Sequence, residues 1–296
     1  MVRMQLLMPR SNSPRSKPTS RRDWLQELSL IGMVHLPALP GSASASRPLA
    51  EIADRAVTEA RLLARADFQA VIVENFGDSP FAADCVPAET VASMAIIVRE
   101  VVAAVRIPVG VNVLRNDALA ALGVAAVTGA AFIRVNILSG TYATDQGLIS
   151  GGARELLQRR DQVARHVRIA ADVHVKHAAP ISQPDLILAA EETAYRAGAD
   201  VLIVSGAATG SPADLDAAAR VKAAVPDRPL WIGSGVDPTT VAACLGVADA
   251  VIVGTCLKRG GKTTAALDHR RLRSFSAVAA GVRRDGERAE PRRRRG

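Results

Sequence analysis

The sequence predicts an α/β protein folded as a single (β/α)8 barrel, and three observations favour this class. Its 296 residues exceed an average domain but suit one barrel, which commonly takes about 250 residues. Hydrophobic residues make up 49% of the chain and aromatic residues only 3%, a composition typical of buried parallel strands packed under helices. Eight short β-branched segments each precede a helical segment, a rhythm that an open doubly wound sheet rarely keeps.

The expected elements follow one another in strand–helix pairs along the chain. Each strand is a short run rich in Val, Ile or Leu, and these runs fall at 31–36, 70–75, 109–114, 132–137, 171–177, 201–205, 230–234 and 250–254. Each helix carries apolar residues every three to four positions, and the helices are expected near 48–66, 87–105, 117–128, 153–166, 184–197, 213–224, 238–245 and 264–279.

The net charge of +8 is located in the two ends of the chain. Residues 1–22 carry six basic groups and no acid (+6), and residues 281–296 carry seven arginines against three acids (+4), which leaves 8 − 6 − 4 = −2 for the rest. Neither end has an apolar face to bury, so we expect disordered basic tails around a barrel over 23–280. Such tails attract polyanions only weakly and in a salt-sensitive way, and no specific nucleic-acid binding is expected.

The chain is expected to be cytoplasmic. Arg21 and Arg22 resemble a twin-arginine export signal, but Gln26 and Glu27 interrupt the apolar region, and cleavage at 43–45 would remove the first strand. No stretch is apolar enough to span a membrane. The three cysteines lack the spacing of a metal site or a disulfide framework, as expected in a reducing compartment: Cys85, Cys244 and Cys256.

The clearest functional signal is a set of polar residues on the inner faces of the strands. Along 171–177, Asp172, His174 and Lys176 alternate with small apolar residues, and the apolar face of a barrel strand must pack against the helices. The polar set should therefore face the barrel interior and mouth. The same alternation turns inward Glu74, Asn112, Arg134 and Asn136, with His35 on the first strand and Ser205 on the sixth. A purely structural alternative is an internal ion-pair network of Arg134 with Glu74 or Asp172.

A phosphate site is expected at the other side of the mouth. The seventh strand ends in Gly233, Ser234 and Gly235, and the eighth ends in Gly254 and Thr255. Barrel phosphate sites lie in the loops after these two strands, where small residues let backbone N–H groups approach an anion. The loop 206–210 likewise consists of small residues. The expected ligand is a phosphorylated, sugar-like small molecule.

The chain resembles the BtpA/SgcQ family. The strings that carry the resemblance are 32–37 with 39–41, 74–78, 108–117, 132–136, 172–177, and 253–255 followed by Lys258. The resemblance implies a ribulose-phosphate-binding-type barrel, a part in photosystem I biogenesis in cyanobacteria, and a link to sugar-phosphate metabolism, but it brings no established reaction. Gly260 and Gly261 depart from the family pattern, in which an acidic residue is expected before the second glycine.

Several chemistries remain open for the inward set. We assign catalysis to Glu74, Asp172, His174 and Lys176, and substrate binding to His35, Asn112, Arg134, Asn136 and Ser205. Lys176 could form a Schiff base as in aldolases, or Glu74 or His174 could act as the base of an isomerisation. Metal hydrolysis fits poorly, because the first strand lacks a His-x-His pair and the last lacks an Asp. The remaining histidines are expected to be structural: His166, His177 and His269.

Three functions follow from these residues and the resemblance. The first is a phosphosugar isomerase or aldolase-type lyase that needs no cofactor and no metal. The second, implied by the resemblance, is a non-catalytic assembly factor that keeps a ligand-binding barrel. The third is a phosphoribosyl or nucleotide transfer enzyme, although no pyrophosphate-binding loop supports it. A homo-oligomer is compatible with all three.

Overall fold

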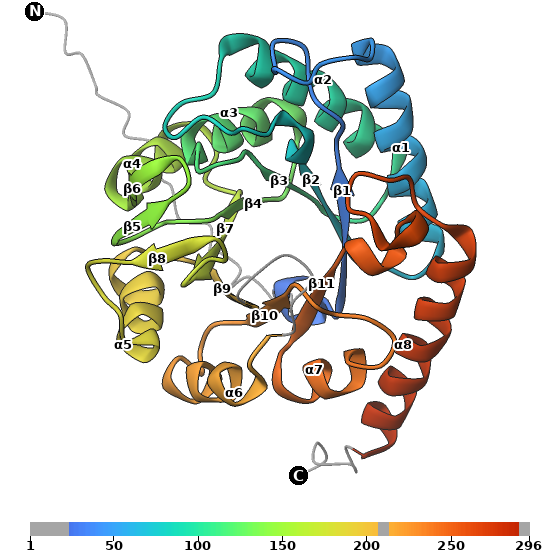
Figure 1. Ribbon diagram of the computed structural model, residues 1–296. Helices are drawn as coiled ribbons and strands as arrows, with labels where there is room; N and C mark the ends of the chain where they lie inside the picture. Colours follow the sequence, from blue (N-terminus) through green and yellow to red (C-terminus); the bar gives the residue numbers. More distant parts are fainter. Residues whose placement is uncertain (1–23, 207–212, 290–296) are drawn as a thin grey trace, which may run out of the picture.

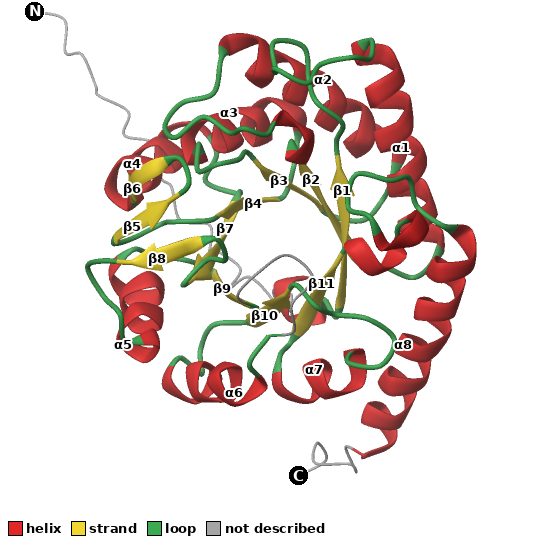
Figure 2. Cartoon of the chain, in the orientation of Figure 1, coloured by secondary structure: helices red, strands yellow, loops and turns green. Residues whose placement is uncertain are grey.

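The fold is a closed barrel of eight parallel strands ringed by helices (Figures 1 and 2). The computed structural model describes residues 24–206 and 213–289. The order around the barrel is β1, β2, β3, β4, β7, β9, β10 and β11, which pairs again with β1, so the predicted (β/α)8 class is confirmed. The N-terminal tail over 1–22, the export-like Arg21 and Arg22, most of the 206–210 loop and residues 290–296 lie outside the described residues.

The strands and helices begin and end close to the expected positions. The barrel strands are β1 (Leu30–His35), β2 (Ala70–Glu74), β3 (Val109–Asn112), β4 (Phe132–Val135), β7 (Arg168–Val173), β9 (Val201–Ser205), β10 (Leu230–Gly233) and β11 (Ala250–Val253). The helices are α1 (Leu49–Arg65), α2 (Ala88–Ala104), α3 (Ala118–Thr128), α4 (Ala153–Val163), α5 (Leu186–Glu191), α6 (Leu215–Ala224), α7 (Val241–Val247) and α8 (His269–Ala289). No helix within the described ranges is long and apolar enough to cross a membrane.

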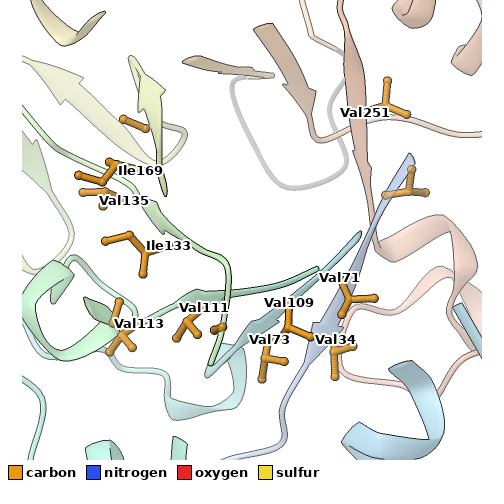
Figure 3. Packing of buried hydrophobic residues seen from close by; sticks show 14 of the residues in the cluster. Val34, Val71, Val73, Val109, Val111, Val113, Ile133, Val135, Ile169 and Val251 are labelled. Atoms are coloured by element: carbon orange, nitrogen blue, oxygen red, sulfur yellow. The ribbon is translucent and has the colours of Figure 1, made fainter. Parts of the chain in front are cut away.

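The two faces of each strand pack as the alternation predicts. Outward valines and isoleucines of β2, β3 and β4 form one large buried cluster with the helices, as Figure 3 shows for Val71, Val111 and Ile133. A separate cluster fills the lower barrel interior, where the Phe132 and Trp231 rings meet edge to face with centroids 5.6 Å apart. The short helix η1 (Trp24–Glu27) covers this cluster from below, because the Trp24 ring lies 5.8 Å from that of Phe132. Polar chemistry is thereby confined to the upper interior.

A small antiparallel sheet over the mouth was not predicted. Strands β5 (Thr141–Thr144), β6 (Gly147–Ser150) and β8 (Ala178–Pro180) pair in the order β6–β5–β8. These strands have only three or four residues each, which is too short to give a periodic signal in the sequence. Gly147 takes a φ of 107° at the hairpin turn, a backbone conformation that favours glycine. Ile137, Tyr142 and Val175 form a third apolar cluster beneath the sheet.

Two predicted boundaries are wrong. The fifth barrel strand runs from Arg168 to Val173 rather than over 171–177, because the backbone leaves the extended region at His174 (φ 50°) and again at His177 (φ 58°). The last helix, α8, continues through residue 289, so residues 281–289 of the expected disordered tail are helical.

A buried ion pair outside the barrel fixes the loop after β11. Lys258 is fully buried, and its Nζ donates a hydrogen bond to Glu59 Oε2 of α1. Arg55 Nε donates to the other oxygen of Glu59 at 3.1 Å. Desolvation lowers the pKa of the Lys258 ammonium, while the attraction of Glu59 opposes this change. The pair ties the first helix to the last barrel strand and holds the short helix η4 (Thr255–Leu257) at the mouth.

Candidate functional site

A cavity of about 680 Å³ opens at the carboxyl ends of the barrel strands. Most of the predicted site residues line it: His35, Glu74, Arg134, Asn136, Lys176, Ser234, Gly235, Gly254 and Thr255. Met33 and Ile252 form part of its apolar wall, and Phe76 and Phe81 contribute from the loop after β2. The cavity has the size and mixed polar and apolar lining of a small-molecule site.

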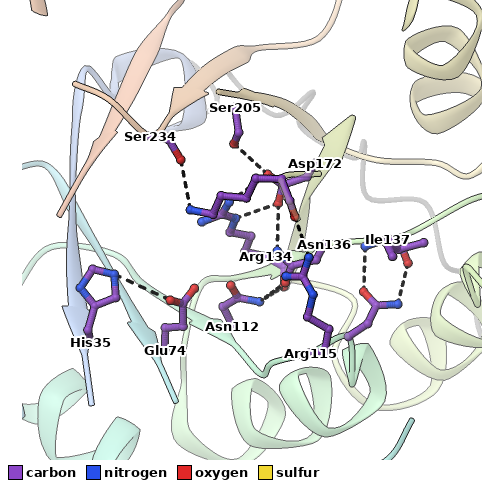
Figure 4. A network of polar contacts seen from close by, with 12 residues as sticks. His35, Glu74, Asn112, Arg115, Arg134, Asn136, Ile137, Asp172, Ser205 and Ser234 are labelled. Carbon is purple, nitrogen blue, oxygen red and sulfur yellow. Dashed lines mark hydrogen bonds and ion pairs between the residues drawn. The ribbon is translucent and has the colours of Figure 1, made fainter. Parts of the chain in front are cut away.

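The centre of the polar interior is an ion pair between Arg134 and Asp172 (Figure 4). Arg134 Nε donates to Asp172 Oδ2 at 2.9 Å and Nη2 donates to Oδ1 at 2.8 Å, so the contact is bidentate. Ser205 Oγ donates to the same carboxylate at 3.2 Å. Desolvation alone would lower the pKa of Arg134, but the Asp172 charge and hydrogen bond raise it overall. The Asp172 carboxylate is therefore paired with Arg134, as in the alternative of an internal ion-pair network.

Two asparagines extend this network. Asn112 Nδ2 donates to Asn136 Oδ1 at 3.0 Å and to the Arg134 carbonyl at 3.1 Å. Asn136 lines the cavity, whereas Asn112, Asp172 and Ser205 lie behind the lining residues. These three polar groups were predicted to meet substrate or to act in catalysis. The structure gives them contacts that orient Arg134 and Asn136 instead.

His174 does not line the cavity, although strand alternation predicted that it would face inward. The backbone turns at this residue, and the ring Nε2 lies 2.9 Å from the Gln183 carbonyl oxygen. The ring also meets that of Tyr142 edge to face, with centroids 6.2 Å apart. His174 thus holds the segment before α5 against the small sheet, as a structural histidine. His177, expected to be structural, lines the cavity instead.

Lys176 reaches across the mouth although the strand ends before it. Its Nζ donates to Ser234 Oγ at 3.1 Å, on the loop after β10 (Figure 4). No carboxylate of the described part of the chain forms an ion pair with this ammonium. Desolvation lowers the pKa of Lys176, and the nearby Arg134 cation lowers it further. Lys176 is therefore an amine whose charge is poorly compensated within the protein.

Glu74 and His35 form a second titratable pair on the opposite wall. Glu74 Oε1 lies 3.7 Å from His35 Nε2, and both side chains are buried. Burial raises the pKa of Glu74, and burial with the nearby Lys258 and Lys176 charges holds the pKa of His35 well below its usual value. The His35 Nδ1 atom is buried without a hydrogen-bond partner. Burial thus shifts the pKa of each group toward its neutral form, an arrangement suited to proton transfer.

The predicted phosphate loops lie side by side at the end of β10 and β11, which are neighbouring strands. Ser234 (φ 71°) and Gly235 (φ 65°) turn the chain sharply after β10. Gly254 makes room for the imidazole, because a Cβ there would lie 2.7 Å from His35 Cε1. Gly233 lies behind the cavity, where a Cβ would meet Ser205 Oγ at 2.9 Å, so its small size serves the Asp172 network rather than an anion.

Arg115 lines the cavity and was not assigned a role from the sequence. It follows β3, beyond the last residue for which strand alternation gives a direction. Its side chain is only 5% exposed, and Nη2 donates to the Lys176 carbonyl at 2.7 Å. Desolvation lowers the pKa of its guanidinium. The signal available in the sequence was its place in the string 108–117, in which it directly precedes the polar residues Asn116 and Asp117.

The eight parallel strands and their ring of helices define a TIM-barrel protein, with a cavity at the carboxyl ends of the strands. The chain belongs to the BtpA family, whose model matches residues 26–281.

Curated relatives agree with this assignment over most of their lengths. The photosystem I biogenesis protein BtpA of Synechocystis sp. is 44% identical over 86% of this chain and 89% of its own. An uncharacterized protein of Pyrococcus abyssi is 41% identical over 86% and 96%. The sgc region protein SgcQ of Escherichia coli is 31% identical over 88% and 99%.

Solved structures similar to this chain show the fold alone. The native KDPGal structure superposes with a TM-score of 0.54 at 15% identity, over 88% of this chain and 97% of the other. Phosphoribosyl anthranilate isomerase from Thermus thermophilus gives a TM-score of 0.52 at 12% identity, over 86% and 100%. At such identities the site residues cannot be carried over.

Removing the charge of Asp172 should destabilise the fold, whereas removing the charge of Lys176 should leave its stability nearly unchanged. Asp172→Asn leaves Arg134 buried without its counterion, so we expect the free energy of unfolding to fall by about 3–5 kcal/mol. Lys176→Met removes a desolvated amine that lacks a carboxylate partner and keeps the length of the side chain, so the melting temperature should stay within a few degrees of the parent. Urea and thermal unfolding of both variants test this. A Lys176→Met variant as unstable as Asp172→Asn would make Lys176 a structural residue.

Glu74→Gln should stabilise the fold increasingly as pH rises. Because the folded-state pKa of Glu74 lies above that of the unfolded chain, its contribution to stability is complete below the unfolded pKa. That contribution is lost as pH rises through the folded pKa, by roughly 1.4 kcal/mol for each unit of difference. The difference between the free energies of unfolding of Glu74→Gln and of the parent should therefore grow, in favour of the variant, from pH 4 to pH 8. The exposed Glu155→Gln is the control. A constant difference across this range would contradict a raised pKa of Glu74 in the folded protein.

Proposed function

We propose that the mouth cavity binds a phosphorylated, sugar-like small molecule and catalyses proton transfer next to its carbonyl group, as an isomerase or a lyase. The observation that carries this proposal is the convergence of Glu74, His35 and Lys176 on one cavity, with burial shifting the pKa of each toward its neutral form. Strongly perturbed pKa values of groups in one cleft mark candidate catalytic residues.

The phosphate would bind between the loops after β10 and β11. Ser234 and Thr255 supply hydroxyl groups, and Gly235 and Gly254 leave the backbone accessible. The Lys176 ammonium is already held at Ser234 Oγ and adds a positive charge. The isomerase from Thermus thermophilus, which acts on a phosphoribosyl compound by its name, supports a phosphorylated ligand for this fold.

The reacting carbon would lie between Glu74 and Lys176. In its ionised form Glu74 would accept the proton from the carbon next to the carbonyl, and the electron pair of that C–H bond would move onto the carbonyl oxygen. The Lys176 ammonium would stabilise the resulting enolate. Return of the proton to the neighbouring carbon completes an isomerisation. A lyase would reach the same enolate from a β-hydroxy carbonyl compound: Glu74 would accept the proton of the β-hydroxyl, the bond between the α and β carbons would break with its electron pair moving onto the carbonyl oxygen, and the β carbon would leave as an aldehyde or ketone. His35 would move a proton between the two oxygens of the substrate.

A second candidate function is assembly or stability of a partner complex without turnover. It is favoured by the 44% identity to the Synechocystis protein, whose name places it in photosystem I biogenesis. An assembly factor could work with or without a bound ligand. It would not require Glu74 to exchange protons with that ligand.

Proton exchange separates the two functions. Pentose and hexose phosphates incubated with the full chain in D2O should gain deuterium next to the carbonyl, as detected by NMR. Glu74→Gln should reduce this exchange by at least about a hundredfold, since general bases commonly contribute 10²–10⁴-fold. The same variant should still be stabilised by the phosphate ester, by about 2.7 kcal/mol at 100 times the dissociation constant.

The control for binding is Ser234→Ala, which should weaken stabilisation by phosphate esters while leaving the response to unphosphorylated sugars unchanged. Stabilisation by phosphate esters without any exchange in the parent protein would favour the assembly factor. Absence of both would refute the proposal.

A further inference from the structure

The wall of the cavity opposite the phosphate loops carries a cation with no counterion. In the eight-stranded ring, β3 stands four strands from β10, so Arg115 and Ser234 lie at opposite sides of the mouth. Arg115 is 5% exposed, and no acidic residue of the described chain forms an ion pair with it. The acids that influence it are Asp172, which is bound to Arg134, Asp145 and Glu74. A buried guanidinium without an anion is costly unless a ligand supplies one.

The backbone around Arg115 is held rigidly in place. The fully buried Asn75 accepts a hydrogen bond from Leu114 N at 2.7 Å, and its Nδ2 is anchored by Asp78 at 2.9 Å. On the other side, Asn116 donates to the Ile137 carbonyl at 2.9 Å and accepts from the Ile137 N–H at 2.7 Å. Figure 4 shows this second clamp beside the guanidinium. A segment fixed from both sides presents its side chain in one position, as a binding group requires.

Only one of the five guanidinium N–H groups has a protein partner. Nη2 donates to the Lys176 carbonyl, and the guanidinium, which lines the cavity, forms no other side-chain hydrogen bond within residues 24–206 and 213–289. Asp145 also lines the cavity, but it is exposed on the hairpin turn and accepts a hydrogen bond from Gln146 at 2.6 Å. Solvent therefore screens that carboxylate, which leaves the Arg115 donors free for a ligand.

Lys176 connects the two sides of the mouth. Its carbonyl oxygen accepts from Arg115, and its ammonium donates to Ser234 on the opposite wall. One residue thus fixes the distance between the arginine and the phosphate loops. A ligand seated across this span would meet a cationic group at each end.

We propose that Arg115 forms a second anion subsite, so that the ligand is a small molecule with a phosphate at one end and a carboxylate or second phosphate at the other. This inference rests on the proposed function, because it takes the first phosphate to bind at Ser234 and Thr255. A planar guanidinium suits both anions, since each can accept two parallel N–H bonds. Neutral phosphosugars would satisfy only one half of the site.

Matched open-chain ligands test the subsite. Glucitol 6-phosphate, 6-phosphogluconate and glucitol 1,6-bisphosphate share one carbon skeleton and differ at carbon 1, which is neutral, carboxylated or phosphorylated. Calorimetric titration of the full chain should give a dissociation constant at least about tenfold lower for one of the two doubly anionic compounds than for glucitol 6-phosphate. The compound preferred identifies whether the second anion is a carboxylate or a phosphate.

Substitutions of Arg115 test whether this residue causes the preference for a doubly anionic ligand. Arg115→Met should reduce the ratio of dissociation constants to within about twofold and leave glucitol 6-phosphate binding unchanged, whereas Arg115→Lys should keep part of the ratio through its charge. Arg99→Met, on the exposed face of α2, is the control for loss of an arginine. If Arg115→Met fails to fold, the parent ratio and the Arg115→Lys variant decide.

Equal binding of all three compounds by the parent protein, or an equal loss for all three in Arg115→Met, would overturn the subsite while leaving the phosphate site intact. Failure of the phosphate site in the proposed function would look different, because none of the three compounds would then bind the parent protein.

Discussion

The bidentate contact between Arg134 and Asp172 is the interaction on which the upper barrel depends. It joins neighbouring strands β4 and β7, and it collects hydrogen bonds from Ser205 and, through Asn136, from Asn112. Because the pair is buried, each charge is tolerable only in the presence of the other. The inner polar residues thereby fall into two groups. The central ion pair is electrically neutral, whereas the titratable residues around it lack a fully compensating partner.

The uncompensated groups are the ones suited to chemistry. Glu74 and His35 are pushed toward their neutral forms by burial, and Lys176 and Arg115 hold charges that the protein does not balance. A core selected only for stability would avoid such groups, and their gathering in one cavity is the feature on which the proposed function rests. The Glu59–Lys258 pair has the opposite character, since it lies outside the barrel and fixes the loop after β11.

Sequence alternation predicts the site as far as the strands extend. It places Glu74, Arg134 and Asn136 correctly at the mouth, because each belongs to a regular strand or follows it directly. It is wrong for His174, where a positive φ removes the residue from the strand phase. Lys176 reaches the cavity as predicted, but from a loop. Arg115 could not be assigned, because its position depends on two asparagine clamps that join distant segments and leave no periodic signal.

The central claim is that the cavity holds one ligand by its two anionic ends. A crystal structure of the full chain grown with 6-phosphogluconate tests this most directly. We expect the phosphate against Ser234 and Thr255, the carboxylate within hydrogen-bond distance of Arg115, and the sugar hydroxyls between Glu74 and Lys176. Density for the phosphate at any other surface, with the cavity occupied only by solvent, would contradict it.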